Sequence, residues 1–257
     1  MRRYLTIACE GVSLAATLDL ADGTSGLLIV SGGTETRSGP HAAMTRLALR
    51  IAAAGFPVLR FDRRGVGDSD GDDPGFDGAG ADIAAAATAL RAACPAVTRI
   101  VGLGTCDAAS ALALAHRNAT LDALILINPW VVPPSSDLPP PAAIRRRYLD
   151  RLTSLDGWSR LARGRIDMRK AWRGLRSAAR ANEPALLAAQ VRHGLAGADA
   201  TVLLATGDAT AQAFIAEHRR NAFPAVLHSR ETGSHALIGP GDADWLAARV
   251  LGALAGP

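Results

Sequence analysis

The chain has 257 residues, of which 49% are hydrophobic, 20% charged and 4% aromatic. This length and apolar content suit a large globular α/β domain and exclude a disordered or fibrous chain; no apolar run approaches the roughly 20 residues of a membrane span. Cys9, Cys94 and Cys106 are too few for a disulfide framework, which favours a reducing compartment. The net charge is +4, and Lys170 is the only lysine among 28 basic residues. Together with the high alanine content, this excess of arginine indicates GC-rich codon usage rather than nucleic-acid binding.

The amino terminus predicts a mature cytoplasmic start. The apolar stretch that follows Arg2 and Arg3 is about six residues long, shorter than the roughly 7–15 residues of an export signal. It ends at Glu10.

In chain order, short apolar runs alternate with alanine- and leucine-rich helical patterns. The expected strands cover residues 4–9, 12–18, 26–30, 57–61, 99–103, 121–127, 201–206 and 225–228. The expected helices cover residues 44–54, 82–93, 107–117, 211–220 and 244–255. The first two strands form a hairpin across Glu10 and Gly11.

This alternation stops between residues 131 and 200. Residues 131–141 hold five prolines, and the pattern from 142 to about 197 is helical only. A β-α-β series interrupted by helices predicts an α/β fold: a mostly parallel eight-stranded sheet with helices on both faces and an inserted helical cap. The core would be residues 1–132 and 198–257, and residues 133–197 would form an inserted helical cap. The cap carries 13 basic and 5 acidic side chains, a net charge of +8.

The strongest chemical signal is Gly104-Thr105-Cys106-Asp107-Ala108, between an expected strand and an expected helix. Small residues on both sides allow the sharp turn that lifts a nucleophile out of a sheet. Cys106 takes the nucleophile position, the N–H of Asp107 would face the reacting oxygen, and the helix amino terminus would favour a thiolate. The alternative is a small buried cysteine at a tight turn.

A second oxyanion donor is expected in the loop after the third strand. Gly33 and Thr34 are the candidates, and the sequence does not separate them. An ordinary strand-end turn is the alternative.

The acid and base are expected after the last two strands. Asp208 follows the strand at 201–206 and is the candidate acid, although it would also suit the cap of the next helix. His235 follows the last strand and is the candidate base. The chain order Cys106, Asp208, His235 is that of nucleophile, acid and base in this fold.

Residues 62–69 have the form D-x-R-G-x-G-x-S, which recurs in α/β-hydrolase-fold enzymes as a structural turn whose Asp and Arg pair. The stretch lacks the lysine of a phosphate-binding loop. No metal site is expected, because Cys and His pairs at ligand spacing are absent from the sequence. Nucleic acid is not an expected partner, because the basic segment holds few aromatic residues.

The chain resembles the α/β-hydrolases over nearly its whole length. More narrowly, it resembles the first of two hydrolase families encoded beside the exosortase A system of polysaccharide-producing Gram-negative bacteria. The similar stretches are residues 9–11, 31–33 with Arg37 and His41, 54–62, 106–110, 128–130 and 165–169. The resemblance implies an esterase-like hydrolase of unknown substrate. One departure is that the usual G-x-x-D spacing is shortened to Gly207-Asp208.

These features predict a hydrolase that cleaves an ester or thioester, or transfers its acyl group, through Cys106, His235 and Asp208. Arg37 and His41, with the basic cap, suggest an anionic substrate. The cap could also touch an anionic membrane surface. No cofactor is implied. The competing hypothesis is a non-catalytic accessory protein that binds a partner of the polysaccharide machinery.

Overall fold

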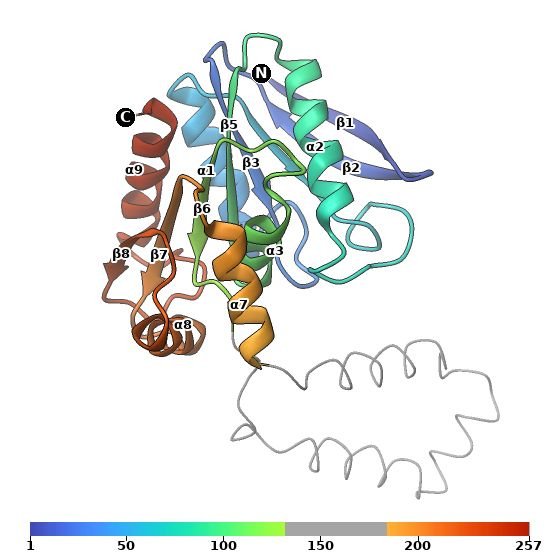
Figure 1. The fold of residues 1–257 in the computed structure, drawn as a ribbon. Coiled ribbons are helices and arrows are strands. Elements are labelled where there is room, and N and C mark those ends of the chain that lie inside the picture. The colour runs from blue at the N-terminus through green and yellow to red at the C-terminus, as the bar shows by residue number, and fades with distance from the viewer. Residues whose placement is uncertain (132–183, 257) are drawn as a thin grey trace, which may run out of the picture. The chain divides into compact units, whose positions relative to one another are not determined.

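The computed structural model describes residues 1–131 and 184–256, and these contain one eight-stranded sheet (Figure 1). Its order is β1-β2-β4-β3-β5-β6-β7-β8. The β1–β2 and β2–β4 pairs are antiparallel and all other pairs are parallel. The strands are β1 (Arg2–Cys9), β2 (Val12–Asp19), β3 (Ser25–Val30), β4 (Val58–Phe61), β5 (Arg99–Thr105), β6 (Ala123–Ile127), β7 (Ala200–Ala205) and β8 (Val226–Arg230). The mostly parallel eight-stranded sheet and its amino-terminal hairpin are therefore confirmed.

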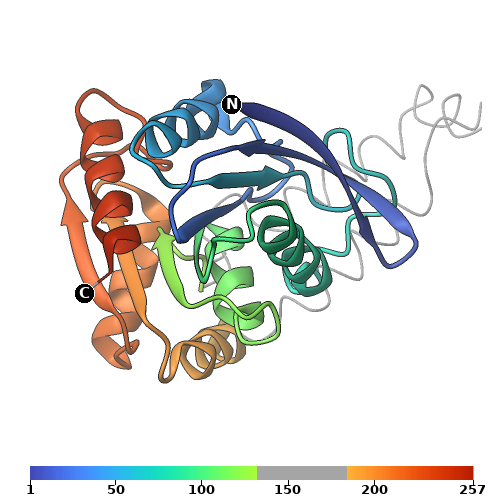
Figure 2. The same ribbon diagram turned by 90° about the horizontal axis from the view of Figure 1, so that it is seen from above.

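Helices cover both faces of the sheet (Figure 2). Helices α1 and α9 lie on one face, and α2 and α3 lie on the other. Helix α7 packs closely on α3, where a Cβ on Gly194 would come within 2.2 Å of the Ala113 oxygen. The helical elements in the described residues are η1 (Pro40–Ala42), α1 (Ala43–Ala53), α2 (Gly80–Ala93), α3 (Asp107–Ala115), α7 (Pro184–Leu195), α8 (Ala209–Arg220) and α9 (Asp242–Ala255).

The central strands are largely apolar because both faces of the sheet are covered. Every residue of β4 and β6 is buried. Strands β3, β5 and β6 pack with α1 and α9 into one apolar cluster that includes Ile51 and Val250. Burial of each large aliphatic side chain contributes about 1.5–3 kcal/mol, which holds the sheet edge that carries the site in a fixed place.

The predicted cap lies largely outside the described residues. Within the described part, the chain from Ala188 onward belongs to the same compact unit as Met1–Val131. Ala188, Val191 and Leu195 of α7 are buried there. Ala188 and the residues that follow it up to 197 lie within the range 133–197 that the sequence analysis assigned to the cap, and the cap itself stays a prediction. None of the described helices combines the length and hydropathy needed to cross a membrane.

Candidate active site

Cys106 occupies a sharp turn between β5 and α3. Its backbone has φ 60° and ψ −120°, a conformation that costs on the order of 1–3 kcal/mol for a residue with a side chain. The turn also needs a glycine two residues earlier, because a Cβ on Gly104 would lie 2.8 Å from the carbonyl carbon and oxygen of Ala108. The Cys106 side chain is half-buried. This is the geometry of a nucleophile elbow.

Hydrogen bonds fasten the elbow to the end of the neighbouring strand β6. The Cys106 N–H donates to the Ile127 oxygen at 2.9 Å, and the Trp130 N–H donates to the Cys106 oxygen at 3.1 Å. The Ser110 hydroxyl donates to the Trp130 oxygen at 2.7 Å. The strained turn is therefore held from outside its own segment.

Asp208 and His235 form a side-chain pair. Asp208 Oδ2 lies 2.9 Å from His235 Nδ1. The other carboxylate oxygen accepts the backbone N–H groups of Thr210 at 2.9 Å and Ala211 at 3.0 Å, at the start of α8. The two interpretations weighed for Asp208 therefore coexist, because one oxygen caps the helix and the other faces the histidine.

The loops that carry this pair are joined by backbone hydrogen bonds. The N–H of Gly207 donates to the Thr232 oxygen, and that of Thr206 donates to the Arg230 oxygen, both at 2.9 Å. These bonds continue the β7–β8 pairing beyond the strands. They bring Asp208 beside His235 although the two residues lie 27 positions apart.

Asn128 braces the histidine loop, a role that the sequence analysis missed. It is fully buried at the end of β6, and its Nδ2 donates to the His235 carbonyl oxygen at 2.7 Å. Its Oδ1 accepts the Ala205 N–H at 2.9 Å. The available signal was an asparagine directly after a buried strand and before a proline, in the stretch 128–130 that the sequence analysis named only for its resemblance to a family.

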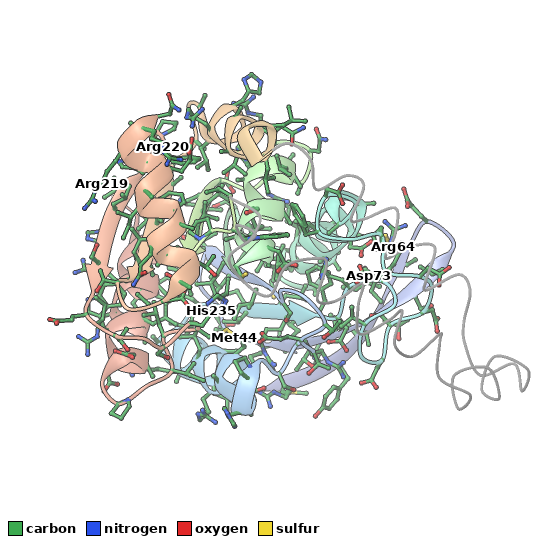
Figure 3. The ribbon with its side chains drawn as sticks, turned by 90° about the horizontal axis from the view of Figure 1, so that it is seen from below. Met44, Arg64, Asp73, Arg219, Arg220 and His235 are labelled. Carbon is green, nitrogen blue, oxygen red and sulfur yellow. The ribbon has the colours of Figure 1, made fainter. Side chains whose placement is uncertain are left out.

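A cavity of about 340 Å³ opens above the elbow. Figure 3 looks onto this edge of the sheet and labels His235 there. The lining residues are Gly32, Gly33, Thr34, Glu35, Thr105, Cys106, Asp107, Trp130 and His235. The structure thus brings the candidate nucleophile, base and oxyanion residues to one cavity. No hydrogen bond joins Cys106 to His235 among the described residues.

The N–H of Gly33 is bound to a carboxylate. It donates to Asp107 Oδ1 at 2.9 Å and Oδ2 at 3.0 Å. Gly33 is a central residue of a tight turn, with φ 52°, that is closed by the Glu35 N–H on the Gly32 oxygen at 3.0 Å. The sequence analysis left Gly33 and Thr34 as alternatives for the second oxyanion donor. The Asp107 carboxylate binds the N–H of the first of them, Gly33.

The expected thiolate is not the resting form of Cys106. Burial, followed by the negative charge of Asp107, raises the pKa of the Cys106 thiol to about 11. A backbone hydrogen bond from Asp107 acts in the opposite direction but is outweighed. Burial also raises the pKa of Glu35, and Asp107 adds to this shift. Cys106 is therefore a neutral thiol at neutral pH.

Arg37 and His41 are absent from the lining of this cavity. The Arg37 guanidinium binds the buried Asp62, the Thr17 hydroxyl at 3.2 Å and Asp68 at 2.9 Å. His41 is exposed, and its carbonyl accepts a bond from Arg46 at 2.6 Å. Their substrate-binding role stays a prediction.

The D-x-R-G-x-G-x-S turn pairs its charges with partners outside itself, which corrects the expected Asp–Arg pairing within the motif. Asp62 is bound by Arg37, and Arg64 pairs with the buried Asp82 at 2.5 Å and with Glu10. The turn thereby ties β4 to the first hairpin and to α2. Among the described residues, no group of three His, Cys, Asp or Glu side chains is placed to hold a metal ion.

A mostly parallel sheet with a sharp strand-to-helix turn after β5, an aspartate after β7 and a histidine after β8 has the α/β-hydrolase architecture. The chain belongs to the alpha/beta hydrolase family, whose model matches residues 27–249. No curated protein matches the chain.

Several solved structures share the fold. The alpha/beta hydrolase GrgF from Penicillium sp. sh18 is 17% identical with a TM-score of 0.67, covering 99% of this chain and 98% of that one. An esterase from Pyrococcus furiosus is 19% identical with a TM-score of 0.60, covering 97% of this chain and 88% of that one. A dienelactone hydrolase from Anabaena variabilis is 13% identical with a TM-score of 0.61, covering 97% and 94%.

Proposed function

We propose that the protein is a hydrolase that cleaves an ester or thioester through Cys106, His235 and Asp208. The observation that carries the proposal is the Asp208–His235 pair, 2.9 Å apart, at the cavity that the Cys106 elbow also lines. With Nδ1 donating to Asp208, Nε2 is left as the basic nitrogen of His235. The similar esterase and dienelactone hydrolase structures agree with carboxyl-ester chemistry.

The reaction proceeds in two steps. His235 Nε2 removes the proton of the neutral thiol as Cys106 Sγ attacks the substrate carbonyl carbon. The tetrahedral intermediate collapses with loss of the alcohol or thiol, which receives the proton from Nε2. Water, activated by the same nitrogen, then cleaves the acyl-cysteine thioester and releases the acid. An amine or alcohol in place of water gives acyl transfer.

The oxyanion is held by the N–H groups of Asp107 and Gly33. In the resting structure the Gly33 N–H already binds an anionic oxygen, that of Asp107, at 2.9 Å. This contact favours Gly33 over Thr34 as the second donor. The substrate oxygen must replace the Asp107 carboxylate, so productive binding requires the Asp107 side chain to rotate away.

The narrower assignment concerns the biological setting. Resemblance to the exosortase-associated hydrolases, with Arg37, His41 and the basic cap, supports an anionic or carrier-linked acyl substrate of a cytoplasmic polysaccharide system and a peripheral membrane contact. Most of the residues of the predicted cap lie outside the described part of the chain, so sequence alone carries this assignment.

Intact-protein mass spectrometry after mixing with p-nitrophenyl esters and acyl thioesters tests the proposal. We expect an acyl adduct on Cys106 in the wild type, none in Cys106→Ala, and slow formation in His235→Ala. Cys94→Ala is the matched control, since Cys94 is a buried cysteine away from the cavity. Absence of an adduct and of turnover in the wild type across the panel would contradict the proposal and favour a non-catalytic binding protein.

A further inference from the structure

Arg63 connects the turn after β4 to the oxyanion loop. Its side chain is only 2% exposed, and its Nη2 donates to the carbonyl oxygen of Gly33 at 2.5 Å. Arg63 stands at a variable position of the D-x-R-G-x-G-x-S turn, next to the motif arginine, Arg64. The sequence analysis treated the whole turn as structural.

The other contacts of Arg63 are weak for a buried cation. Its Nη1 lies 3.9 Å from Asp73 and has no hydrogen-bond partner among the described residues. A buried charge with incomplete pairing costs free energy, and a shorter apolar side chain would avoid that cost. The short hydrogen bond to the Gly33 oxygen is therefore the interaction that best accounts for a guanidinium at this buried position.

That bond acts on the residue that binds the oxyanion. A tight turn can exchange conformations when its central peptide rotates, and glycine makes the rotation easy because both signs of φ are open to it. A charge-assisted hydrogen bond to the Gly33 oxygen fixes the orientation of that peptide. That peptide joins Gly33 to Thr34. The Gly33 N–H belongs to the preceding peptide, which pivots on the same Cα, so anchoring the carbonyl limits the rotation of Gly33 that would turn its N–H away from Asp107 and the cavity.

The rest of the loop is anchored separately. Arg60, also 2% exposed, donates to the Arg37 oxygen at 2.7 Å, and the Asp62 carboxylate accepts the Arg37 N–H. These bonds hold the loop beyond the turn. Among the hydrogen bonds of the described residues, the Arg63 bond is the one that reaches the Gly33 carbonyl from the turn after β4.

We infer that Arg63 is a positioning residue for the reaction: it fixes the Gly33 turn so that the Gly33 N–H meets the developing oxyanion. This inference rests on the proposed function. Its effect belongs to the transition state, because the negative oxygen develops only as sulfur adds to the carbonyl.

Two reactions of the same thiol separate this role from a general effect on folding. Acylation of Cys106 by p-nitrophenyl acetate passes through an oxyanion, whereas alkylation by iodoacetamide displaces iodide and forms none. We expect Arg63→Gln to slow acylation about 10- to 100-fold, as a displaced catalytic group does, and to leave the alkylation rate unchanged. Arg63→Lys, which keeps a cation able to reach the carbonyl, should recover part of the acylation rate.

Arg64→Gln is the matched control. Arg64 is the neighbouring, largely buried arginine. It pairs with Asp82 and Glu10, and Figure 3 labels it well apart from His235. Its loss should lower the thermal midpoint without changing the ratio of acylation to alkylation. Equal ratios in wild type and Arg63→Gln would overturn the inference while leaving the proposed function intact. Failure of the wild type to acylate would overturn both.

Discussion

The two halves of the candidate active site differ in how complete they are. On the acid–base side, Asp208 already meets His235 at 2.9 Å, and Asn128 and the joined β7 and β8 loops hold the pair in place. On the nucleophile side, Cys106 is a neutral thiol with a pKa of about 11, and the Gly33 N–H is bound to Asp107. The candidate base therefore already has its partner, whereas the candidate nucleophile is protonated and one candidate oxyanion donor is occupied.

This difference follows from the charges. The Asp208 carboxylate stabilises a charge that His235 acquires during the reaction, so the pair can be assembled in advance. Burial and, after it, the negative charge of Asp107 oppose the formation of a thiolate at Cys106. In the proposed mechanism a substrate must also displace the Asp107 carboxylate from Gly33. Substitutions can perturb each side of the site separately. The changes in reaction rate are expected to be larger on the acid–base side than on the nucleophile side.

The largest effect is expected from Asp208→Asn. Asparagine keeps an oxygen for the cap of α8 but presents the wrong partner to His235 Nδ1, so acylation of Cys106 should fall about 10²- to 10⁴-fold. Asp208→Ala should lose activity similarly and also lose about 0.5–2 kcal/mol of stability, because the Thr210 and Ala211 N–H groups lose their acceptor. Burst kinetics and urea unfolding measure the two effects. Wild-type acylation in Asp208→Asn would remove Asp208 from the mechanism.

Asn128→Ala should weaken the brace behind His235. It leaves the His235 carbonyl and the Ala205 N–H without their partner, at a cost of about 1–3 kcal/mol for each buried group left unpaired. Acylation should slow with it, since the histidine backbone is released. Denaturant unfolding and stopped-flow acylation check this. Asn221→Ala, which removes an exposed amide, is the control and should change neither; an equal loss there would contradict the brace.

The smallest effect is expected from Asp107→Asn, and it has the opposite sign. Removing this negative charge should lower the pKa of Cys106 below its value of about 11. At pH 8 the thiolate fraction then rises, and iodoacetamide alkylation should accelerate about 3- to 10-fold, since one pKa unit is a factor of ten. Asp199→Asn, at an exposed pair with Arg99, should leave the rate unchanged. An unchanged rate in Asp107→Asn would show that burial alone sets the pKa.

The sequence by itself determined the order of the strands and helices and pointed to Cys106, Asp208 and His235 as the candidate site residues. Continuous apolar runs such as the one at β3 occur where a strand is covered on both faces of a sheet. The small residues Gly104 and Ala108 leave room for a sharp turn at Cys106. Both features are local, so periodicity and residue size were sufficient to predict them. The same holds for the positions of Asp208 and His235 after their strands.

Only the tertiary structure decided the interactions between distant segments. The bonds from Arg63 to Gly33 and from Asn128 to His235 join residues 30 and 107 positions apart, which no local pattern encodes. The pKa of Cys106 was predicted in the wrong direction because the helix amino terminus is visible in sequence, whereas burial is not. Local sequence patterns were therefore enough to locate the candidate reacting groups at the ends of their strands. Long-range packing decided the protonation state of Cys106 and the hydrogen bonds that hold Gly33 and His235.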